Sequence, residues 1–118
     1  MSDKSDAARN LTVDFITRRL QGFEDRVGKL TDEIEVTQKE YVAALIEEVV
    51  LAPGGLPVDS QARTEDFKKK LEGLFQARKT VVTNLNNLQS LKTGLEKGSH
   101  AKEMEQLAAK IEEMERLD

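Results

Sequence analysis

The strongest constraint on the fold is a heptad pattern of apolar residues that runs from Val13 to Tyr41. Its steps alternate between three and four residues, which is typical of a helix that buries one narrow seam against another helix. The pattern persists for about four heptads without a Gly-Pro break. Its members are Val13, Ile16, Leu20, Phe23, Val27, Leu30, Ile34, Thr37 and Tyr41. The sequence therefore predicts a long helix that packs against a second one.

This first helix is expected to span about residues 6–51, with Ser5 or Asp6 as its N-terminal cap. Residues 1–10 are polar and mixed in charge, so we predict that they form a flexible tail before a hairpin of residues 11–97. They do not resemble a signal peptide. No apolar run in the chain approaches the roughly 20 residues that span a bilayer.

The segment 52–57 reads Ala-Pro-Gly-Gly-Leu-Pro and predicts a break, because its prolines remove amide donors and its glycines let the chain reverse. A second helix is expected to restart at Asp59, Ser60 or Thr64, with Thr64 favoured, and to run to about residue 97. Its heptad seam is Phe67, Leu71, Leu74, Arg78, Val81, Leu85, Leu88, Lys92 and Leu95. The short connection favours antiparallel packing of the two helices.

That packing is expected to bring Leu74 near Tyr41, Leu85 near Leu30 and Leu95 near Leu20. Arg78 and Lys92 allow two interpretations, since each is a charged residue at a seam position. Their stems can be buried while their charges reach solvent. Alternatively, they pair with an acidic residue across the hairpin and thereby set the register.

A third helix is expected within residues 98–118, with Gly98 as a left-handed end to the second helix and Ser99 as a possible cap for the third. Its apolar series is Met104, Leu107, Ile111 and Met114. This series is out of phase with the second seam, so a turn is predicted near Gly98. A second interpretation is that 98–118 is a fused or truncated segment, because Gly-Ser-His resembles a cloning remnant.

The distribution of charge supports a bundle in which the second helix contacts the other two. Residues 1–51 hold 7 basic and 11 acidic groups, residues 52–97 hold 8 and 5, and residues 98–118 hold 3 and 6. The middle helix is therefore basic between two acidic ones, an arrangement that guides partner choice more than stability. The predicted fold class is all-α: a long antiparallel helical hairpin, coiled-coil-like, with a short third helix.

The sequence shows no pattern typical of catalysis or of a cofactor site. There is no cysteine and a single histidine, His100, so no zinc constellation is recognisable. Acidic pairs such as Glu47-Glu48 are typical of the solvated outer face of a helix. The basic run 68–70 lacks interleaved aromatic residues, and the net charge is −4, so nucleic-acid binding is not expected. We predict that the chain is not an enzyme and binds no cofactor.

The end of the hairpin near the prolines has more apolar residues than two helices can enclose. We predict a partner-binding surface there, formed by Tyr41, Val42, Leu45, Ile46, Val49, Leu56, Val58 and Phe75. The corresponding function is a protein–protein interaction module, scaffold or tether in the cytoplasm that self-associates through this tip. The alternative is an assembly or secretion chaperone that holds a partner helix in an apolar groove. Neither hypothesis includes insertion into a membrane.

Overall fold

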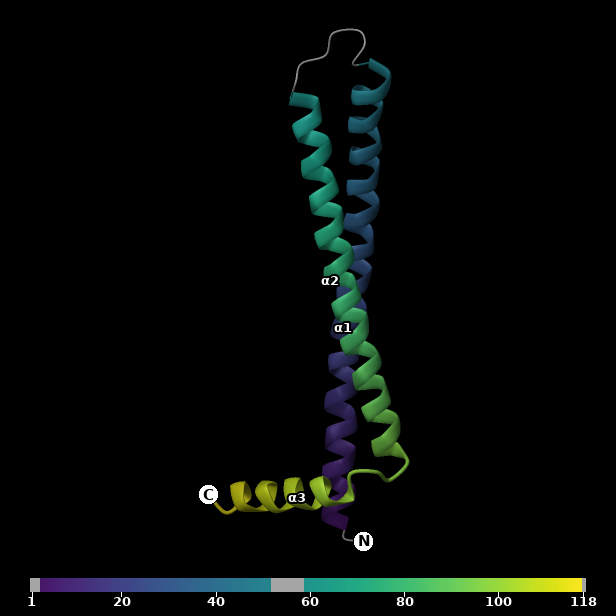
Figure 1. Cartoon of the computed structure of the whole chain (residues 1–118). Coiled ribbons are helices and arrows are strands. Elements are labelled where there is room, and N and C mark those ends of the chain that lie inside the picture. The colour runs from purple at the N-terminus through teal and green to yellow at the C-terminus, as the bar shows by residue number, and fades with distance from the viewer. Residues whose placement is uncertain (1–2, 52–58, 118) are drawn as a thin grey trace. The chain divides into compact units, whose positions relative to one another are not determined.

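The computed structural model describes residues 3–51 and 59–117, and all its regular elements in that part of the chain are helices (Figure 1). They are α1 (Asp3–Ile46), the π-helical segment η1 (Glu47–Leu51), α2 (Asp59–Glu96) and α3 (Ala101–Glu115). The predicted all-α fold, a long helical hairpin with a short third helix, is confirmed.

The helices differ from their predicted bounds mainly at their first residues. Helix α1 begins at Asp3, so residues 3–10 are helical where a flexible tail was predicted. The cause is tertiary, because Ala8 is buried by contacts with α3 and only 1% of its surface is exposed. Helix α2 begins at Asp59, the earliest of the three predicted starts, rather than at the favoured Thr64. The predicted end of the first helix at Leu51 coincides with the end of η1.

The contacts divide the chain into two compact units, which we describe separately. Unit 1 consists of Met1–Glu24 and Asn84–Asp118, and unit 2 of Asp25–Thr83. Each unit therefore contains a part of α1 and a part of α2, but only unit 1 contains α3.

Unit 1 encloses a core in which all three of its helices take part. Ile16 and Leu20 of α1, Leu95 of α2 and Met104 of α3 are buried together. The core is completed by four partly buried residues, Val13, Leu85, Leu88 and Leu107. Leu20 and Leu95 therefore belong to one core, and α3 contributes to the same core as the two long helices.

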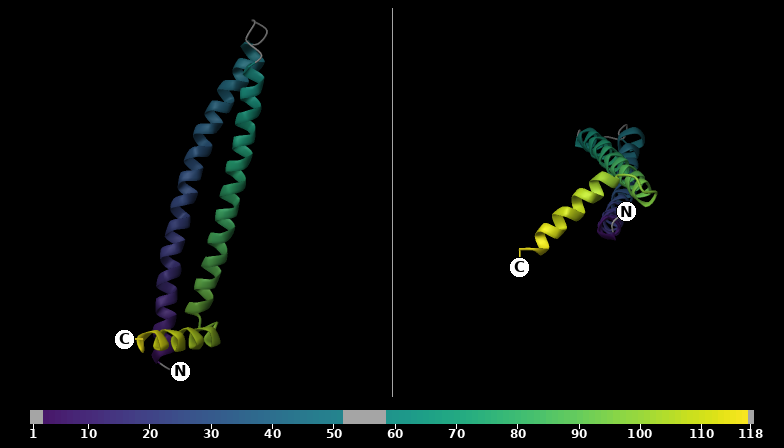
Figure 2. Two further views of the ribbon diagram at one scale, coloured as in Figure 1. Left: turned by 90° about the vertical axis from the view of Figure 1, so that its left-hand side faces the viewer. Right: turned by 90° about the horizontal axis from the view of Figure 1, so that it is seen from below.

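The turn from α2 to α3 lets α3 cross α1 instead of running along it (Figure 2). Gly98 adopts a left-handed conformation with φ of 92°, as predicted, and the amide of Ser99 donates to the carbonyl of Gly94 at 2.9 Å. These features form a Schellman motif. The N-cap of α3 is His100, also left-handed, rather than Ser99. Arg9 of α1 donates from Nη1 to the carbonyls of Leu95 at 2.5 Å and Ser99 at 2.8 Å, which closes the turn.

Unit 2 is a two-helix structure, and four of its buried residues, Ile34, Thr37, Leu71 and Val81, belong to the predicted seams. Its buried residues in the described part are Ile34, Thr37, Ala44, Thr64, Leu71 and Val81. The other predicted seam residues of this unit are half-buried: Val27, Leu30, Tyr41, Phe67, Leu74 and Arg78. The heptad analysis therefore identified the contact face of both helices.

Candidate interaction surfaces

The predicted partner-binding residues divide into an exposed set and a half-buried set. Val42, Ile46, Val49 and Phe75 are exposed, and Val49 is the most exposed of them at 69%. Tyr41 and Leu45 are half-buried because they lie at or beside the seam. Leu56 and Val58 lie outside the described residues.

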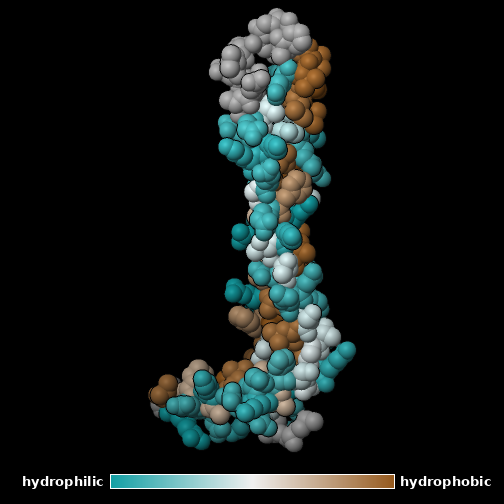
Figure 3. Space-filling view, viewed as in Figure 1, coloured by the Kyte–Doolittle hydropathy of each residue, from teal (hydrophilic) through white to brown (hydrophobic). Residues whose placement is uncertain are grey.

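The exposed apolar residues at the end of α1 and in η1 form a surface that we call the apolar tip. It consists of Val42, Ile46, Val49, Val50 and Leu51. The last two were not among the predicted residues, although the broad apolar run 41–51 contained them. Figure 3 shows hydrophobic residues gathered over the end of α1 and η1. In η1 all three apolar side chains point at least half into solvent, as their exposures of 50–69% show.

Antiparallel pairing places apolar residues of both helices on one side of unit 2. With Val13 at position a of a heptad, Val42 and Val49 of α1 fall at position b, which lies next to position e on the helix surface. With Leu71 at position a of α2, Phe75 and Val82 fall at e. In an antiparallel pair, e positions flank one side of the seam and g positions flank the other. Phe75 and Val82 are exposed by 40% and 37%, so this side carries solvent-exposed apolar groups from both helices.

The opposite side of unit 2 is dominated by charge. Glu33 and Lys70, both at g positions, line one shallow hollow on that side together with Val36. Arg63 and Glu47, also at g positions, form an ion pair across the hairpin with Nη1 and Oε2 3.4 Å apart. The g–g contact supports the assignment of the two sides, and the exposed residues Val42, Val49, Phe75 and Val82 all lie on the e side.

Arg78 contacts the other helix through a hydroxyl group rather than through an acidic residue. Its Nη1 donates to Oγ1 of Thr31 at 3.3 Å, and its guanidinium lies 5.4 Å from the ring centroid of Phe75. Lys92, the second charged seam residue, pairs with Glu96 of its own helix at 4.0 Å. In the part of the chain that the structure describes, neither Arg78 nor Lys92 forms an ion pair with an acidic residue across the hairpin.

The contacts across unit 2 also determine the register of the two helices. In an antiparallel pair the numbers of facing residues add to a constant, which the expected pairs put at 115. The observed contacts, Arg78 with Thr31 and Arg63 with Glu47, add to 109 and 110. A shift of one heptad from the expected register gives a sum of 108, close to both observed values, so Tyr41 is level with about Phe67 rather than with the predicted Leu74. A heptad seam permits registers seven residues apart, so the sequence pattern alone does not choose between them.

Unit 1 presents a second apolar surface, which we call the elbow groove, where α3 crosses α1. It is lined by Leu11, Thr12, Phe15, Leu107 and Ile111. Leu11 and Phe15 are exposed by 56% and 58%, and Met114 continues the apolar series of α3 beyond the groove with 59% exposed. Sequence reasoning missed Leu11 and Phe15, although their spacing of four residues on an otherwise polar side of α1 was a signal.

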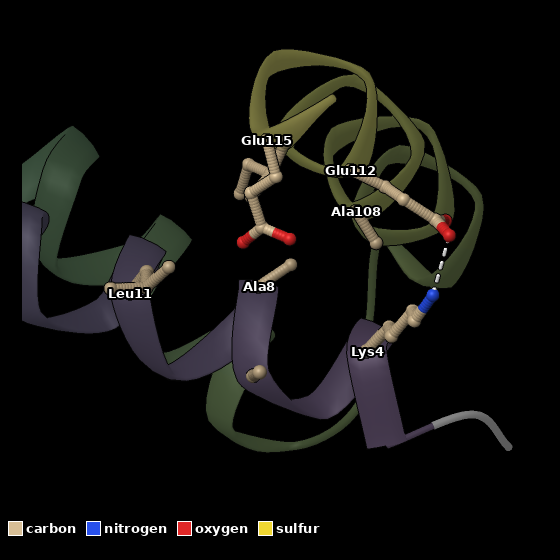
Figure 4. Close-up of a pocket in the computed structure, with 8 residues that line it drawn as sticks. Lys4, Ala8, Leu11, Ala108, Glu112 and Glu115 are labelled. Carbon is tan, nitrogen blue, oxygen red and sulfur yellow. Dashed lines mark hydrogen bonds and ion pairs between the residues drawn. The ribbon is translucent and has the colours of Figure 1, made fainter. Parts of the chain in front are cut away.

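Small residues lie between α1 and α3 where the two helices cross, and an ion pair lies beside them. Figure 4 shows Ala8 and Ala108 between the two helices, with Leu11 and Glu115 on one side. Nζ of Lys4 lies 2.6 Å from Oε1 of Glu112. The hydrogen bond and the positive charge of Lys4 lower the pKa of the Glu112 carboxyl group below its usual value, with a smaller contribution from Arg116.

The described residues contain no group of three or more histidine, aspartate or glutamate side chains placed to hold a metal ion. Within residues 3–51 and 59–117, no helix is long and apolar enough to cross a membrane. His100 lies at the start of α3, where its Nδ1 is 3.8 Å from a carboxylate oxygen of Glu103. We compared the chain with protein-family models, curated proteins and solved structures, and no match was found in any of them.

Proposed function

We propose that the chain is a non-enzymatic protein–protein interaction module, a scaffold or tether. It associates with a second copy through the side of unit 2 that carries Val42, Val49, Phe75 and Val82. The observation that supports this most directly is the joint exposure of Val42, Val49, Phe75 and Val82 at positions that flank one side of the seam. Isolated exposed apolar residues are common on soluble proteins, but a set contributed by two adjacent helices is typical of an interaction site.

Sedimentation of the full chain over a concentration series tests this proposal. A reversible dimer is expected, and the double substitution Val42→Asp with Ile46→Asp should weaken it, because charged groups would have to be desolvated at the contact. Val36→Asp is the matched control, since Val36 is exposed at 57% but lies on the charged side of unit 2. A chain that remains monomeric at every concentration contradicts self-association.

A second candidate function is a chaperone that holds a partner helix, and the elbow groove favours it. The groove offers apolar residues from two helices that cross, and an amphipathic helix with apolar residues at intervals of three and four can lie in such a site. This candidate predicts a monomer that binds an amphipathic helical peptide, with Phe15→Asp abolishing the binding. Val42→Asp with Ile46→Asp should leave peptide binding unchanged, so the two candidates give opposite results.

A further inference from the structure

One exposed stripe of α2 carries charges that are complementary to those of an identical stripe running in the opposite direction. The stripe consists of Lys68, Glu72, Phe75, Lys79 and Val82, which recur at steps of four and three residues and therefore lie in one line along the helix. All five are exposed, Phe75 by 40% and Val82 by 37%. Phe75 is central: Glu72 lies three residues before it and Lys79 four residues after it.

We propose that α2 pairs with α2 of a second copy in antiparallel orientation, crossing at Phe75. This inference rests on the proposed self-association and specifies its helix and its register. A two-fold axis near Phe75 brings the two Phe75 rings together. It also places Glu72 of each chain beside Lys79 of the other, which forms two equivalent pairs of opposite charge.

The contacts of these residues within the chain leave them available for that pairing. Among the described residues, the side chains of Glu72 and Lys79 form no ion pair. The Phe75 ring is supported by the guanidinium of Arg78, which is itself held by Thr31 of α1. The ring is therefore positioned before association.

The outer positions of the stripe fit the same arrangement. Lys68 lies seven residues before Phe75 and Val82 seven residues after it, so the Lys68 stem of one chain covers Val82 of the other. A parallel pairing would instead set Glu72 beside Glu72 and Lys79 beside Lys79, and repulsion between like charges disfavours it. The stripe thus selects both the partner and the orientation.

A charge swap tests the pairing by sedimentation equilibrium of the full chain. Glu72→Lys places two like-charged pairs at the contact and should raise the dimer dissociation constant roughly tenfold or more. Glu72→Lys with Lys79→Glu restores opposite charges and should recover most of the affinity. Lys70→Glu, on the other side of α2, is the matched control and should change the dissociation constant by less than about twofold. Circular dichroism of each variant verifies that the helices remain folded.

Disulfide trapping provides a second test, because the chain contains no cysteine. Gln76 lies beside Phe75 at the crossing, so Gln76→Cys should oxidise readily to a covalent dimer, whereas Lys70→Cys should not. Failure of the charge swap to restore the dimer, or equal trapping at both positions, overturns the pairing. A dimer that ignores Glu72→Lys but is lost with Val42→Asp and Ile46→Asp retains the proposed function and removes this register. A wild-type monomer removes both.

Discussion

The two units of the chain use the same heptad seam but differ in what covers the rest of their helices. In unit 1 the third helix adds Met104 to the core, and Leu95 is exposed by only 1%. In unit 2 two helices pack without a third, and Val49 of the apolar tip remains 69% exposed. Two helices are therefore sufficient to align along a heptad seam, whereas an enclosed core requires a third helix.

The largest expected effect is at the centre of the unit 1 core. Leu95→Ala should lower the free energy of unfolding by about 2–5 kcal/mol, because it removes a buried side chain and leaves a cavity between three helices. Urea denaturation followed by circular dichroism measures this change. Ile46→Ala in unit 2 is the counterpart and should cost less than about 0.5 kcal/mol, since Ile46 is 50% exposed. Similar losses for both variants would contradict the difference between the units.

The next largest effect concerns the attachment of α3 within unit 1. Arg9→Ala should destabilise the chain by about 1.5–3 kcal/mol, because two carbonyl oxygens lose a charged hydrogen-bond donor. Arg19→Ala is the matched control, since Arg19 lies over the exposed ring of Phe15 at 5.7 Å. Hydrogen exchange should show faster opening of α3 in Arg9→Ala and unchanged protection in Arg19→Ala. Equal exchange in the two variants would exclude a special role for Arg9.

Two glycine substitutions should change stability in opposite directions. Gly98→Ala is expected to cost about 1–2 kcal/mol, because the turn requires a left-handed conformation at this position. Gly28→Ala should stabilise the chain by about 0.5–1 kcal/mol, since Gly28 lies within α1 and an added Cβ meets nothing within 4 Å. Thermal unfolding of both variants measures the difference. If Gly98→Ala instead stabilised the chain, the turn would not require a left-handed backbone conformation at this position.

The smallest effect is the pH dependence of the contact between Lys4 and Glu112. Because the folded-state pKa of Glu112 is lowered, this contact contributes stability above the unfolded-state pKa and loses it as the pH falls through the folded-state pKa. An NMR titration of Glu112 should show the lowered pKa in the wild type and a return toward the usual value in Lys4→Ala. The shift should diminish in high salt, since both side chains are exposed to solvent. An unchanged pKa in Lys4→Ala would assign the shift to Arg116 instead.

The sequence alone determined the fold class, the helices and the seam of each long helix. Every predicted seam residue from Val13 to Tyr41 and from Phe67 to Leu95 is buried or half-buried. These features are local or periodic, because a 3–4 repeat of apolar residues specifies which face of a helix is buried whatever it packs against. Gly98 was predictable for the same reason, since the end of a helix imposes its own backbone conformation.

Only the tertiary structure decided the register, the crossing of α3 and the surfaces that result. The heptad repeat allows pairings one heptad apart, and the contacts of Arg78 and Arg63 selected one of them. The helical start at Asp3 and the elbow groove depend on where α3 crosses α1, which the carbonyls bound by Arg9 help to fix. Such contacts join residues about 90 positions apart, as Arg9 and Ser99 are, so no local pattern encodes them.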